Sequence, residues 1–488
     1  MKRNFLAAIF ILVSISSCKS FKLSKTQTEE LIQTPINREQ KIKVDVTKRM
    51  HKATQNPGGV VSCWLMDSDL ERPRTISFAN AMKDMDVKYI RFPYGHLADN
   101  YLWDADGDWG NILTPKVAAS SQAPANWHWA VNQSTGEFIK DMNFDEYITI
   151  CNDVGAEPMV VVNILSYKYA NGPTYEQLKK SAVEWVRYAN ITKGYNVKRW
   201  ALGNEVDHHP EFISQDEYKA LYNDFAKAMK EVDSTIWIGP GLLGNWHANL
   251  LAYNPDNIDF ICVHNYLWKY DWRKHGYEGW KNSTDILVNN VEKVQNIVNN
   301  STIPNTEIHV TELNSYPWPS DNDDLFRALA YGEMILNACS FENVKATYAW
   351  NSHSPWGGEN SKASYDLLDL ENNREPRGDV AKIINENLLD YFLDVPRVNG
   401  FIRMYATVSE TNKDLILILI NKNNEIEKLD IEISGLNSFT SYTIQNYSGT
   451  DPYDESPKMS AQKQIQTDPG NISLALKAVS MSIIKISK

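Results

Sequence analysis

The sequence predicts an α/β protein with a (β/α)₈ TIM barrel followed by a C-terminal antiparallel β-sandwich. Eight short apolar segments rich in β-branched residues recur between residues 59 and 351, separated by stretches long enough to hold a helix. From about residue 391, short alternating segments continue without helical stretches between them. Strands that alternate with helices indicate a parallel sheet covered by helices, and eight such units favour a closed barrel. A doubly wound open sheet is the alternative.

The first residues are expected to be a targeting signal and not part of the folded domain. Basic residues precede the apolar run 5–13, which is too short to span a bilayer and is typical of a signal peptide. Residues 15–18, Ile-Ser-Ser-Cys, resemble a bacterial lipoprotein box, which implies acylation of Cys18. We therefore expect residues 1–18 to be a lipoprotein signal peptide, with an ordinary secretory signal as the alternative. The polar residues 19–38 are expected to form a flexible tether.

These features predict a lipid-anchored protein of the bacterial cell envelope, in the outer membrane and facing the periplasm or the surface. The formal charge of −12 and the lack of a dense Lys/Arg run argue against a nucleic-acid partner. The remaining cysteines lack the spacing of zinc ligands or of a dense disulfide framework, so we expect neither a metal nor a cofactor. They are expected to be buried: Cys63, Cys151, Cys262 and Cys339.

The barrel is expected to occupy residues 59–390. Its eight predicted strands are 59–66, 87–93, 158–164, 197–204, 235–239, 260–266, 307–313 and 346–351. Between the third and fourth strands, apolar residues such as Leu178, Ala182 and Trp185 recur at helical spacing. After the fourth strand, Ser214 and Glu217 form the pattern of a capping box.

The sandwich is expected to occupy residues 391–488. Its predicted strands are 401–408, 415–420, 428–433, 441–445 and 473–486. Residues 39–58 contain a further alternating stretch, 41–46, which we expect to join the sandwich before the chain enters the barrel.

Two barrel strands end in a carboxylic acid among polar and aromatic residues: Glu205 follows the fourth strand and Glu312 lies on the seventh. The C-terminal strand ends of a barrel surround one pocket, so these acids can face each other despite their separation in sequence. Glycoside hydrolysis needs such a pair, one as acid and one as base or nucleophile. A single glutamate at a strand end is more often a solvated rim residue. The pair together indicates a glycosidase.

The residues around both acids resemble a known signature. Gly203-Asn204-Glu205 and Thr311-Glu312 look like the motifs of the large clan of retaining barrel glycosidases, a resemblance that covers roughly residues 59–360. It implies that Glu205 is the acid/base and Glu312 the nucleophile. Within that clan, residues 90–93 (Ile-Arg-Phe-Pro) and 101–104 (Tyr-Leu-Trp-Asp) are similar to the second-strand motif of family 51 α-L-arabinofuranosidases.

This family resemblance implies roles for further residues. Arg91 and Tyr266 would hydrogen-bond Glu312 and keep it ionised, although Arg91 could instead form a structural ion pair beneath the sheet. The sugar subsite would be lined by Asn163, Asn204, which holds the 2-hydroxyl, and His264, for which a core histidine is the alternative. The family places two glycines after Arg-x-Pro, whereas here Tyr94 and His96 put bulky side chains at the pocket wall.

Fifteen tryptophans suit carbohydrate subsites, because sugar rings present flat C–H faces to aromatic rings. Trp350, at the end of the eighth strand, is the strongest candidate for stacking, and ordinary packing explains many of the others. The tryptophans in expected loops are Trp103, Trp109, Trp127, Trp129, Trp246, Trp268, Trp272, Trp318 and Trp356.

The sequence thus predicts a retaining hydrolase of plant or algal polysaccharide that resembles the α-L-arabinofuranosidases and works by double displacement without a cofactor. Its partners are a polysaccharide or oligosaccharide substrate and, through the anchor, a membrane. The altered pocket wall and the loop tryptophans leave open an endo-acting algal galactan hydrolase of the agarase or porphyranase type. A transglycosylase and a non-catalytic surface glycan-binding lipoprotein are further alternatives.

Overall fold

The computed structural model describes residues 40–104, 115–118, 125–267, 270–315, 323–360, 362–398, 400–436 and 439–487. All of them belong to one compact unit, residues 39–488. Cys18 and the expected tether lie outside the described residues. Within the described residues, no helix combines the length and the apolar character that crossing a bilayer requires.

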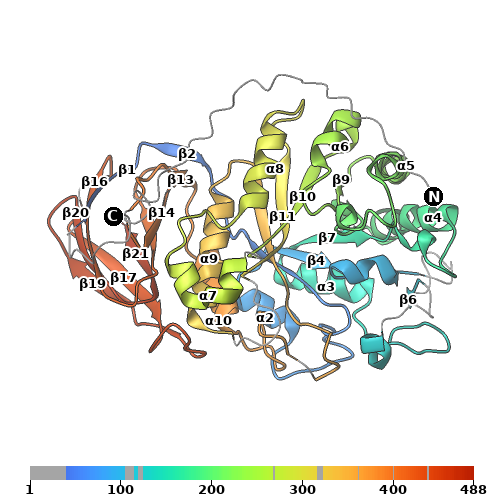
Figure 1. Cartoon of the computed structure of the whole chain (residues 1–488), viewed down its shortest axis with the longest axis horizontal. Coiled ribbons are helices and arrows are strands. Elements are labelled where there is room, and N and C mark those ends of the chain that lie inside the picture. The colour runs from blue at the N-terminus through green and yellow to red at the C-terminus, as the bar shows by residue number, and fades with distance from the viewer. Residues whose placement is uncertain are drawn as a thin grey trace, which may run out of the picture. The chain divides into compact units, whose positions relative to one another are not determined.

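Eight parallel strands form the central barrel (Figure 1). They are β3 (Gly58–Val61), β4 (Tyr89–Phe92), β7 (Glu157–Val162), β8 (Arg199–Leu202), β9 (Trp237–Pro240), β10 (Phe260–Tyr266), β11 (Glu307–Asn314) and β12 (Val344–Ala349). Neighbours in the sheet follow the order of the chain, and β12 pairs with β3. Between β9 and β10, the Asp259 amide donates to the Ile238 carbonyl at 2.9 Å, and the Ile238 amide donates to the Asp259 carboxylate at 2.7 Å. The predicted barrel is therefore confirmed.

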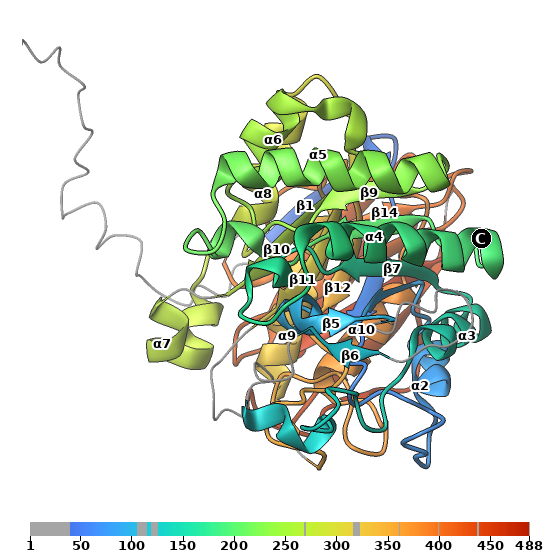
Figure 2. The same cartoon turned by 90° about the vertical axis from the view of Figure 1, so that its right-hand side faces the viewer.

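Helices cover the outside of the barrel (Figure 2). They are α2 (Phe78–Asp84), α3 (Phe144–Val154), α4 (Tyr175–Val186), α5 (Gln215–Val232), α6 (His247–Tyr253), α7 (Tyr270–Lys281), α8 (Asn289–Asn299), α9 (Leu325–Cys339) and α10 (Pro376–Asn385). Helices such as α4, α5 and α8 follow from an amphipathic pattern, because the apolar stripe of a helix is buried against the strands, whereas α9 is buried on almost every side. In α4 that stripe includes Leu178, Ala182 and Trp185, all buried.

The helix ends show why these segments begin where they do. Thr174 and Gln177 form a full capping box at the start of α4. At the start of α5, the Ser214 hydroxyl accepts from the Glu217 amide, while the Glu217 carboxylate accepts from Lys168 and Tyr167 instead of returning to the cap. The sequence pattern therefore located this helix start correctly but only half of the box forms.

Short elements carry the loops between strands and helices. Turns of 3₁₀ helix are η1 (His96–Asn100), η3 (Ala125–Ala130), η4 (Ser166–Lys168), η6 (Val206–His208) and η7 (Pro255–Asn257), and η5 (Arg187–Thr192) is a π-helical extension of α4. Two short strands, β5 (Tyr101–Leu102) and β6 (Lys116–Val117), pair antiparallel after β4. Three of these turns, η1, η4 and η6, lie directly after β4, β7 and β8, and so stand at the carboxyl ends of the barrel strands.

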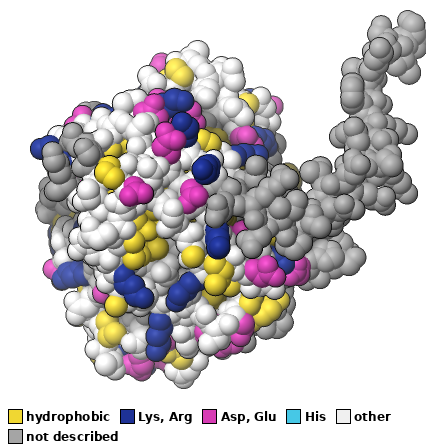
Figure 3. Space-filling model, turned by 90° about the vertical axis from the view of Figure 1, so that its left-hand side faces the viewer, with side chains coloured by type: hydrophobic (Ala, Val, Ile, Leu, Met, Phe, Trp, Pro, Cys, Tyr) yellow, Lys and Arg dark blue, Asp and Glu magenta, His cyan; other side chains and the backbone are white. Residues whose placement is uncertain are grey.

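The C-terminal domain is a sandwich of two sheets. One sheet has the order β1 (Gln40–Asp45), β16 (Glu427–Ser434), β20 (Asn471–Leu476). The other has the order β18 (Lys458–Met459), β17 (Ser441–Ser448), β21 (Ser480–Ile486), β15 (Leu415–Asn421), β14 (Ile402–Val408), β13 (Tyr391–Leu393), β2 (Arg49–Lys52), with β19 (Lys463–Gln466) on β17. Every pair is antiparallel except β1 with β16. On the face drawn in Figure 3, acidic and basic side chains are interspersed, which is typical of a solvated surface.

Buried apolar side chains form two clusters, one within the barrel and its helices and one between the two sheets of the sandwich. The four described cysteines, Cys63, Cys151, Cys262 and Cys339, are free and buried, as expected from their spacing. Burying this apolar area is the main stabilising contribution to both domains.

A buried ionic cluster joins the barrel to the sandwich. Glu333 on α9 accepts from Arg403 Nε at 3.0 Å and from Trp280 Nε1 at 2.7 Å, and Lys422 Nζ lies 3.4 Å away. Arg403 and Lys422 also donate to the carbonyl of Ser283, at 2.5 and 3.1 Å. Trp280 and Ser283 lie between β10 and α8, so the sandwich holds the segment that follows β10. Burial lowers the pKa of Lys422 to about 8, against the opposing effect of Glu333.

Candidate active site

Glu205 and Glu312 face each other at the carboxyl ends of the barrel strands. Glu205 lies three residues beyond the end of β8, and Glu312 lies within β11. A carboxylate oxygen of each and a ring nitrogen of His264 on β10 all lie within 4.8 Å of one another. The barrel therefore brings together the two acids that the sequence singled out.

Glu312 is held by donors on both of its oxygens. Arg91 Nη1 donates to Oε1 at 2.9 Å, and the Tyr266 hydroxyl donates to Oε2 at 2.5 Å. His264 Nδ1 lies 3.4 Å from Oε2. Burial raises the pKa of Glu312, and the charge of Glu205 raises it as well, while His264, Arg91 and Tyr266 lower it. These contacts fix the carboxylate in one position, and the positive charge of Arg91 opposes a metal cation there.

Glu205 has a more open setting. Its side chain is 17% exposed, against 4% for that of Glu312. Its backbone is left-handed, with φ 48° and ψ 36°, and it begins the turn η6. Glu205 Oε1 lies 2.7 Å from His264 Nδ1, and Oε2 lies 3.6 Å from His208 Nδ1. Burial raises the pKa of Glu205, but hydrogen bonding to His208 and His264 outweighs it, so the pKa is lowered.

Asn204 presents one unused donor at the site. Arg91 Nη2 donates to Asn204 Oδ1 at 2.5 Å, and this contact fixes which end of the amide faces Arg91. The other end, Nδ2, is buried and has no hydrogen-bond partner among the described residues. An unpaired buried donor costs free energy, so Asn204 is poised to donate to a hydroxyl group of a ligand.

Trp350 and Gly95 form the wall beside Glu312. A Cβ atom added to Gly95 would lie 2.6 Å from Trp350 Cη2, closer still to the Cζ3 atom of the same ring, and 2.6 Å from Glu312 Oε1. Only glycine therefore fits at this position. The Tyr94 ring lies 4.5 Å from that of Trp350, and its hydroxyl accepts from the Asn351 amide. Tyr94 is fully buried and so lies behind the wall rather than on it, whereas His96 is exposed at the rim.

Two other candidates make backbone and packing contacts. Asn163 uses both ends of its amide: Nδ2 donates to the Tyr101 carbonyl, and Oδ1 accepts from the Ser166 amide, both at 3.2 Å. Trp103 is 2% exposed, stacks on Trp185 at 5.7 Å and donates to the Ser181 carbonyl. The structure thus gives Asn163 a role in shaping the loop after β7. It places Trp103 in the core, not beside the acids, because Trp185 on α4 covers its ring face.

The other tryptophans that the sequence places in loops are either buried, half-buried or outside the described residues. Trp127 is buried, and Trp129, Trp246 and Trp356 are half-buried and pack against the barrel core. Trp109, Trp268 and Trp318 lie outside the described residues. The side chain of Trp272 is likewise outside them.

Two features near the acids carry no recognised motif. Asp99 in η1 is fully buried, and neither of its carboxylate oxygens has a partner among the described residues. Burial raises its pKa well above the usual range, Arg91 lowers it, and Glu205 raises it. The second feature is a group of histidine rings beside Glu205, whose only sequence signal is that His208 and His209 follow Glu205 by three and four residues.

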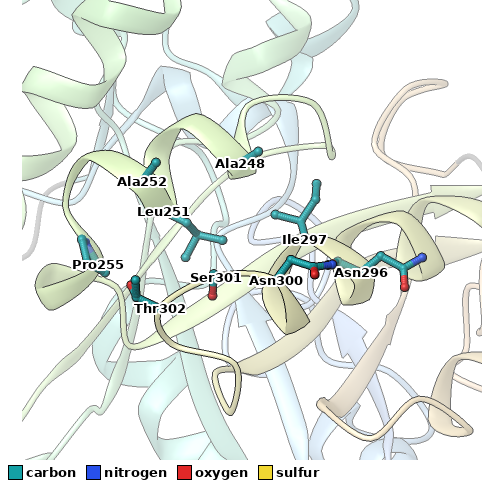
Figure 4. Close-up of a pocket in the computed structure, with 9 residues that line it drawn as sticks. All are labelled: Ala248, Leu251, Ala252, Pro255, Asn296, Ile297, Asn300, Ser301 and Thr302. Atoms are coloured by element: carbon teal, nitrogen blue, oxygen red, sulfur yellow. The ribbon is translucent and has the colours of Figure 1, made fainter.

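A separate hollow of about 550 Å³ lies on the outer surface between α6 and α8 (Figure 4). Its lining combines apolar side chains, such as Leu251 and Ile297, with polar ones, such as Asn300 and Thr302. No Asp, Glu, His or Cys lines it. This hollow therefore lacks titratable groups for acid–base chemistry or for activating a hydroxyl as a nucleophile.

Comparisons with known sequences agree with the resemblance. Residues 81–282 match the model of the α-L-arabinofuranosidase 1 domain. An intracellular exo-α-(1→5)-L-arabinofuranosidase of Bacillus subtilis is 23% identical over 421 residues, covering 75% of this chain and 78% of that protein. α-L-Arabinofuranosidase C of Emericella nidulans is 30% identical over 174 residues, covering 32% and 30%. The exo-enzyme of Acetivibrio thermocellus is 25% identical over 205 residues, and the match spans only 37% of its length.

Solved structures share the fold over nearly the whole chain. An α-L-arabinofuranosidase from Thermotoga maritima, in complex with arabinose, superimposes with a TM-score of 0.70 at 19% identity, over 92% of this chain and 99% of that one. A family 44 xyloglucanase from Paenibacillus polymyxa superimposes with a TM-score of 0.62 at 14% identity, over 92% and 100%. These likenesses confirm the predicted barrel with a sandwich. Together with the sequence matches, they confirm the predicted resemblance to family 51 α-L-arabinofuranosidases.

Proposed function

We propose that this protein is a retaining glycoside hydrolase that cleaves plant or algal polysaccharide, with an activity like that of the α-L-arabinofuranosidases. The observation that carries the proposal is the pair Glu205 and Glu312, whose oxygens approach within 4.8 Å in two different environments. Retaining enzymes keep their two carboxyls about 5–5.5 Å apart, whereas inverting enzymes need about 6.5–9.5 Å to admit a water molecule. The observed separation favours retention.

The reaction is a double displacement. Glu312 attacks the anomeric carbon as the bond to the leaving oxygen breaks, and Glu205 gives that oxygen its proton. Glu205, now a carboxylate, takes a proton from water, and the hydroxide so formed displaces Glu312 from the sugar. The second step returns to Glu205 the proton that the first step gave to the leaving group, so the cycle restores both glutamates and needs no cofactor.

The first step requires a protonated Glu205 and an ionised Glu312, which is the reverse of the pKa directions in the empty site. A bound glycan changes this balance. It removes water from Glu205, which is the more exposed of the two, and burial raises the pKa of a carboxyl. Glu312 is already buried and keeps its donors Arg91 and Tyr266. The proton of the substrate complex is therefore assigned to Glu205.

Two contacts support the assignment of a sugar substrate. Asn204 Nδ2, which is buried and unpaired, is placed to bind the 2-hydroxyl of the sugar attacked by Glu312. Trp350 and Glu312 both border Gly95, so the Trp350 ring is placed to stack against the sugar ring that Glu312 attacks. The arabinofuranosidase names of the matched relatives favour arabinofuranose, and the exposed His96 in place of a small wall residue favours an algal galactan.

The test is product release from arabinan, arabinoxylan, agar, porphyran, carrageenan and β-glucan by the wild type, Glu312→Gln and Glu231→Gln. Glu231 is an exposed glutamate at the end of α5 and serves as the matched control. We expect one polymer to be cleaved with retained anomeric configuration, and Glu312→Gln to be at least about a thousandfold slower while the control is not. Equal cleavage by all three proteins would contradict the mechanism. Binding without cleavage by any of them would favour a glycan-binding lipoprotein.

The lipid anchor is a separate proposal that rests on residues 1–18 alone. Cys18 would carry the acyl chains and hold the enzyme at the outer membrane, with residues 19–38 as the tether. Cells grown with radioactive palmitate should label the wild type and not Cys18→Ser, and only the wild type should sediment with membranes. Label in both proteins would contradict the assignment of Cys18.

A further inference from the structure

Histidine rings extend from Glu205 toward the rim of the barrel. His208 Nδ1 lies 3.6 Å from Glu205, and the rings of His208 and His209 are 5.6 Å apart. The His96 ring, from the turn after β4, lies 4.7 Å from that of His209. His96 and His208 are exposed and His209 is half-buried, so the group borders open solvent beside the acid/base.

Two larger rings continue this row. Phe212 lies 6.1 Å from the His209 ring and is 45% exposed. The ring of Tyr169, from the loop after β7, meets Phe212 edge-on at 6.3 Å and is half-buried. The loops after three neighbouring strands, β4, β7 and β8, therefore contribute to one aromatic surface. What distinguishes this surface is the grouping of several rings at the rim of the site, because neighbouring aromatic rings form a face on which a sugar ring can stack.

We propose that His96, His209, Phe212 and Tyr169, together termed the rim platform, bind the sugar ring on the leaving-group side of the bond that is cleaved. This inference rests on the proposed function and adds to it a minimum substrate. The substrate is an oligosaccharide or polysaccharide that continues beyond the cleaved bond, with a ring that stacks on the platform.

The position of the platform decides which side of the substrate it binds. The acid/base donates its proton to the leaving oxygen, so groups next to it and away from the nucleophile meet the leaving group. His209 is four residues beyond Glu205 on the same loop, and the row runs outward from there. Trp350 and Gly95, in contrast, lie against Glu312 and so belong to the sugar that is attacked.

The chemistry of the platform fits a neutral sugar. Aromatic faces stack on the C–H groups of a pyranose ring, and the Tyr169 hydroxyl and imidazole nitrogens suit its hydroxyl groups. A neutral imidazole offers one donor and one acceptor, which matches a hydroxyl group better than a sulfate or carboxylate.

The first test separates binding from catalysis by using the inactive Glu312→Gln protein as the parent. Affinity electrophoresis in gels containing arabinan, arabinoxylan or agarose compares this parent with versions that also carry Phe212→Ala, His209→Ala or Tyr253→Ala. Tyr253 on α6 is 54% exposed and its ring contacts Lys219 on α5, so it serves as the matched aromatic control outside the platform. We expect each platform change to weaken retardation in the bound polymer by roughly three- to tenfold in affinity, and the control to match the parent.

The second test measures kcat/KM for the same single changes in the active enzyme. The polymer that is cleaved is compared with the glycosyl fluoride of the sugar that it releases, which is α-L-arabinofuranosyl fluoride for arabinan or arabinoxylan and carries no ring on the leaving-group side. The loss on the polymer should exceed the loss on the fluoride by at least about fivefold in Phe212→Ala, because only the polymer reaches the platform. Melting temperatures identify any variant that fails to fold. If Phe212→Ala does not fold, the result for His209→Ala decides whether the platform binds the leaving-group sugar.

The outcomes separate the two proposals. If the polymer is cleaved but neither platform change alters retardation or the ratio of kcat/KM on the polymer to kcat/KM on the fluoride, the proposed role of the platform is wrong and the proposed hydrolase activity is retained. If nothing is cleaved yet Phe212→Ala and His209→Ala lose retardation, the platform binds glycan and the hydrolase is wrong. Equal weakening by Tyr253→Ala would also overturn the platform.

Discussion

Arg91 donates to Glu312 across 2.9 Å in a site where their side chains are only 1% and 4% exposed. The second nitrogen of the same guanidinium donates to Asn204. One side chain on β4 therefore sets the charge of the proposed nucleophile on β11 and the orientation of the proposed sugar-binding amide after β8. This coupling makes Arg91 the residue whose replacement tests both.

Arg91→Met should move the acidic limb of the pH profile of kcat/KM to higher pH. Arg91 lowers the pKa of Glu312, so its removal lets burial raise that pKa further. The folded protein then binds a proton more tightly than the unfolded chain, so the variant also loses stability as pH rises through the raised pKa. Arg91→Lys keeps the charge and should show the smaller displacement. Identical acidic limbs in all three proteins would show that Arg91 does not act on the nucleophile.

Glu205→Ala should lose activity on polymer by about 10²–10⁴-fold, because a poor leaving group needs the proton. An aryl glycoside with an acidic phenol as leaving group should be much less affected in its first step. Azide should then restore turnover by replacing the missing base and yield a glycosyl azide with retained configuration. A product of inverted configuration, or no rescue of Glu205→Ala, would mean that the roles of the two acids are reversed.

Gly95→Ala should impair catalysis because of the space that the added methyl group takes. That group would lie 2.6 Å from Glu312 Oε1 and at least as close to the Trp350 ring, so one of them has to move. A displacement of about 1 Å in a reacting group can cost about 100-fold in rate, and overpacking costs about 1–3 kcal/mol in stability. Steady-state kinetics and urea unfolding measure the two effects. Wild-type kcat in a folded Gly95→Ala protein would contradict the wall as described.

Lys422→Met should change how stability depends on pH above neutrality. Lys422 has a folded-state pKa of about 8, below its value of about 10.4 in an unfolded chain. Between these values the unfolded chain binds more protons, so the wild type gains stability with rising pH, on the order of 1–3 kcal/mol, and the variant lacks this gain. Urea unfolding at pH 7 and pH 10 measures the difference. Lys428→Met, at an exposed position on β16, is the control, and equal pH dependence in Lys422→Met and the wild type would exclude the effect.

The sequence predicts the barrel well because its signals are local. Apolar strands and amphipathic helices alternate, and the positions of Glu205 and Glu312 at strand ends follow directly from that register. Strand limits move by only a few residues: the fifth strand, expected at 235–239, is Trp237–Pro240 in the structure. The geometry of a closed barrel then places the two acids together without further information.

Side-chain directions in the loops could not be predicted in the same way. Trp103 and Tyr94 follow a strand that ends at Phe92, beyond which no periodicity says which way a ring points. Trp103 packs on Trp185 and Tyr94 packs behind Trp350 because those partners come from distant parts of the chain. The contacts of Glu333 are equally non-local. It lies within an apolar helix, and no sequence pattern predicts that Arg403 and Lys422 are its partners.

The strand order of the sandwich has a consequence for when the protein can fold. β1 pairs with β16, and the bridge between Lys43 and Glu432 spans 389 residues of sequence. During synthesis from the N-terminus, β1 and β2 leave the ribosome first and wait for almost the entire chain before their partners exist. The barrel can fold as it emerges, but the sandwich closes only after release, when β21 inserts between β15 and β17. A chain truncated before residue 480 would keep both proposed catalytic acids and still present the apolar edge of β15 to chaperones and proteases.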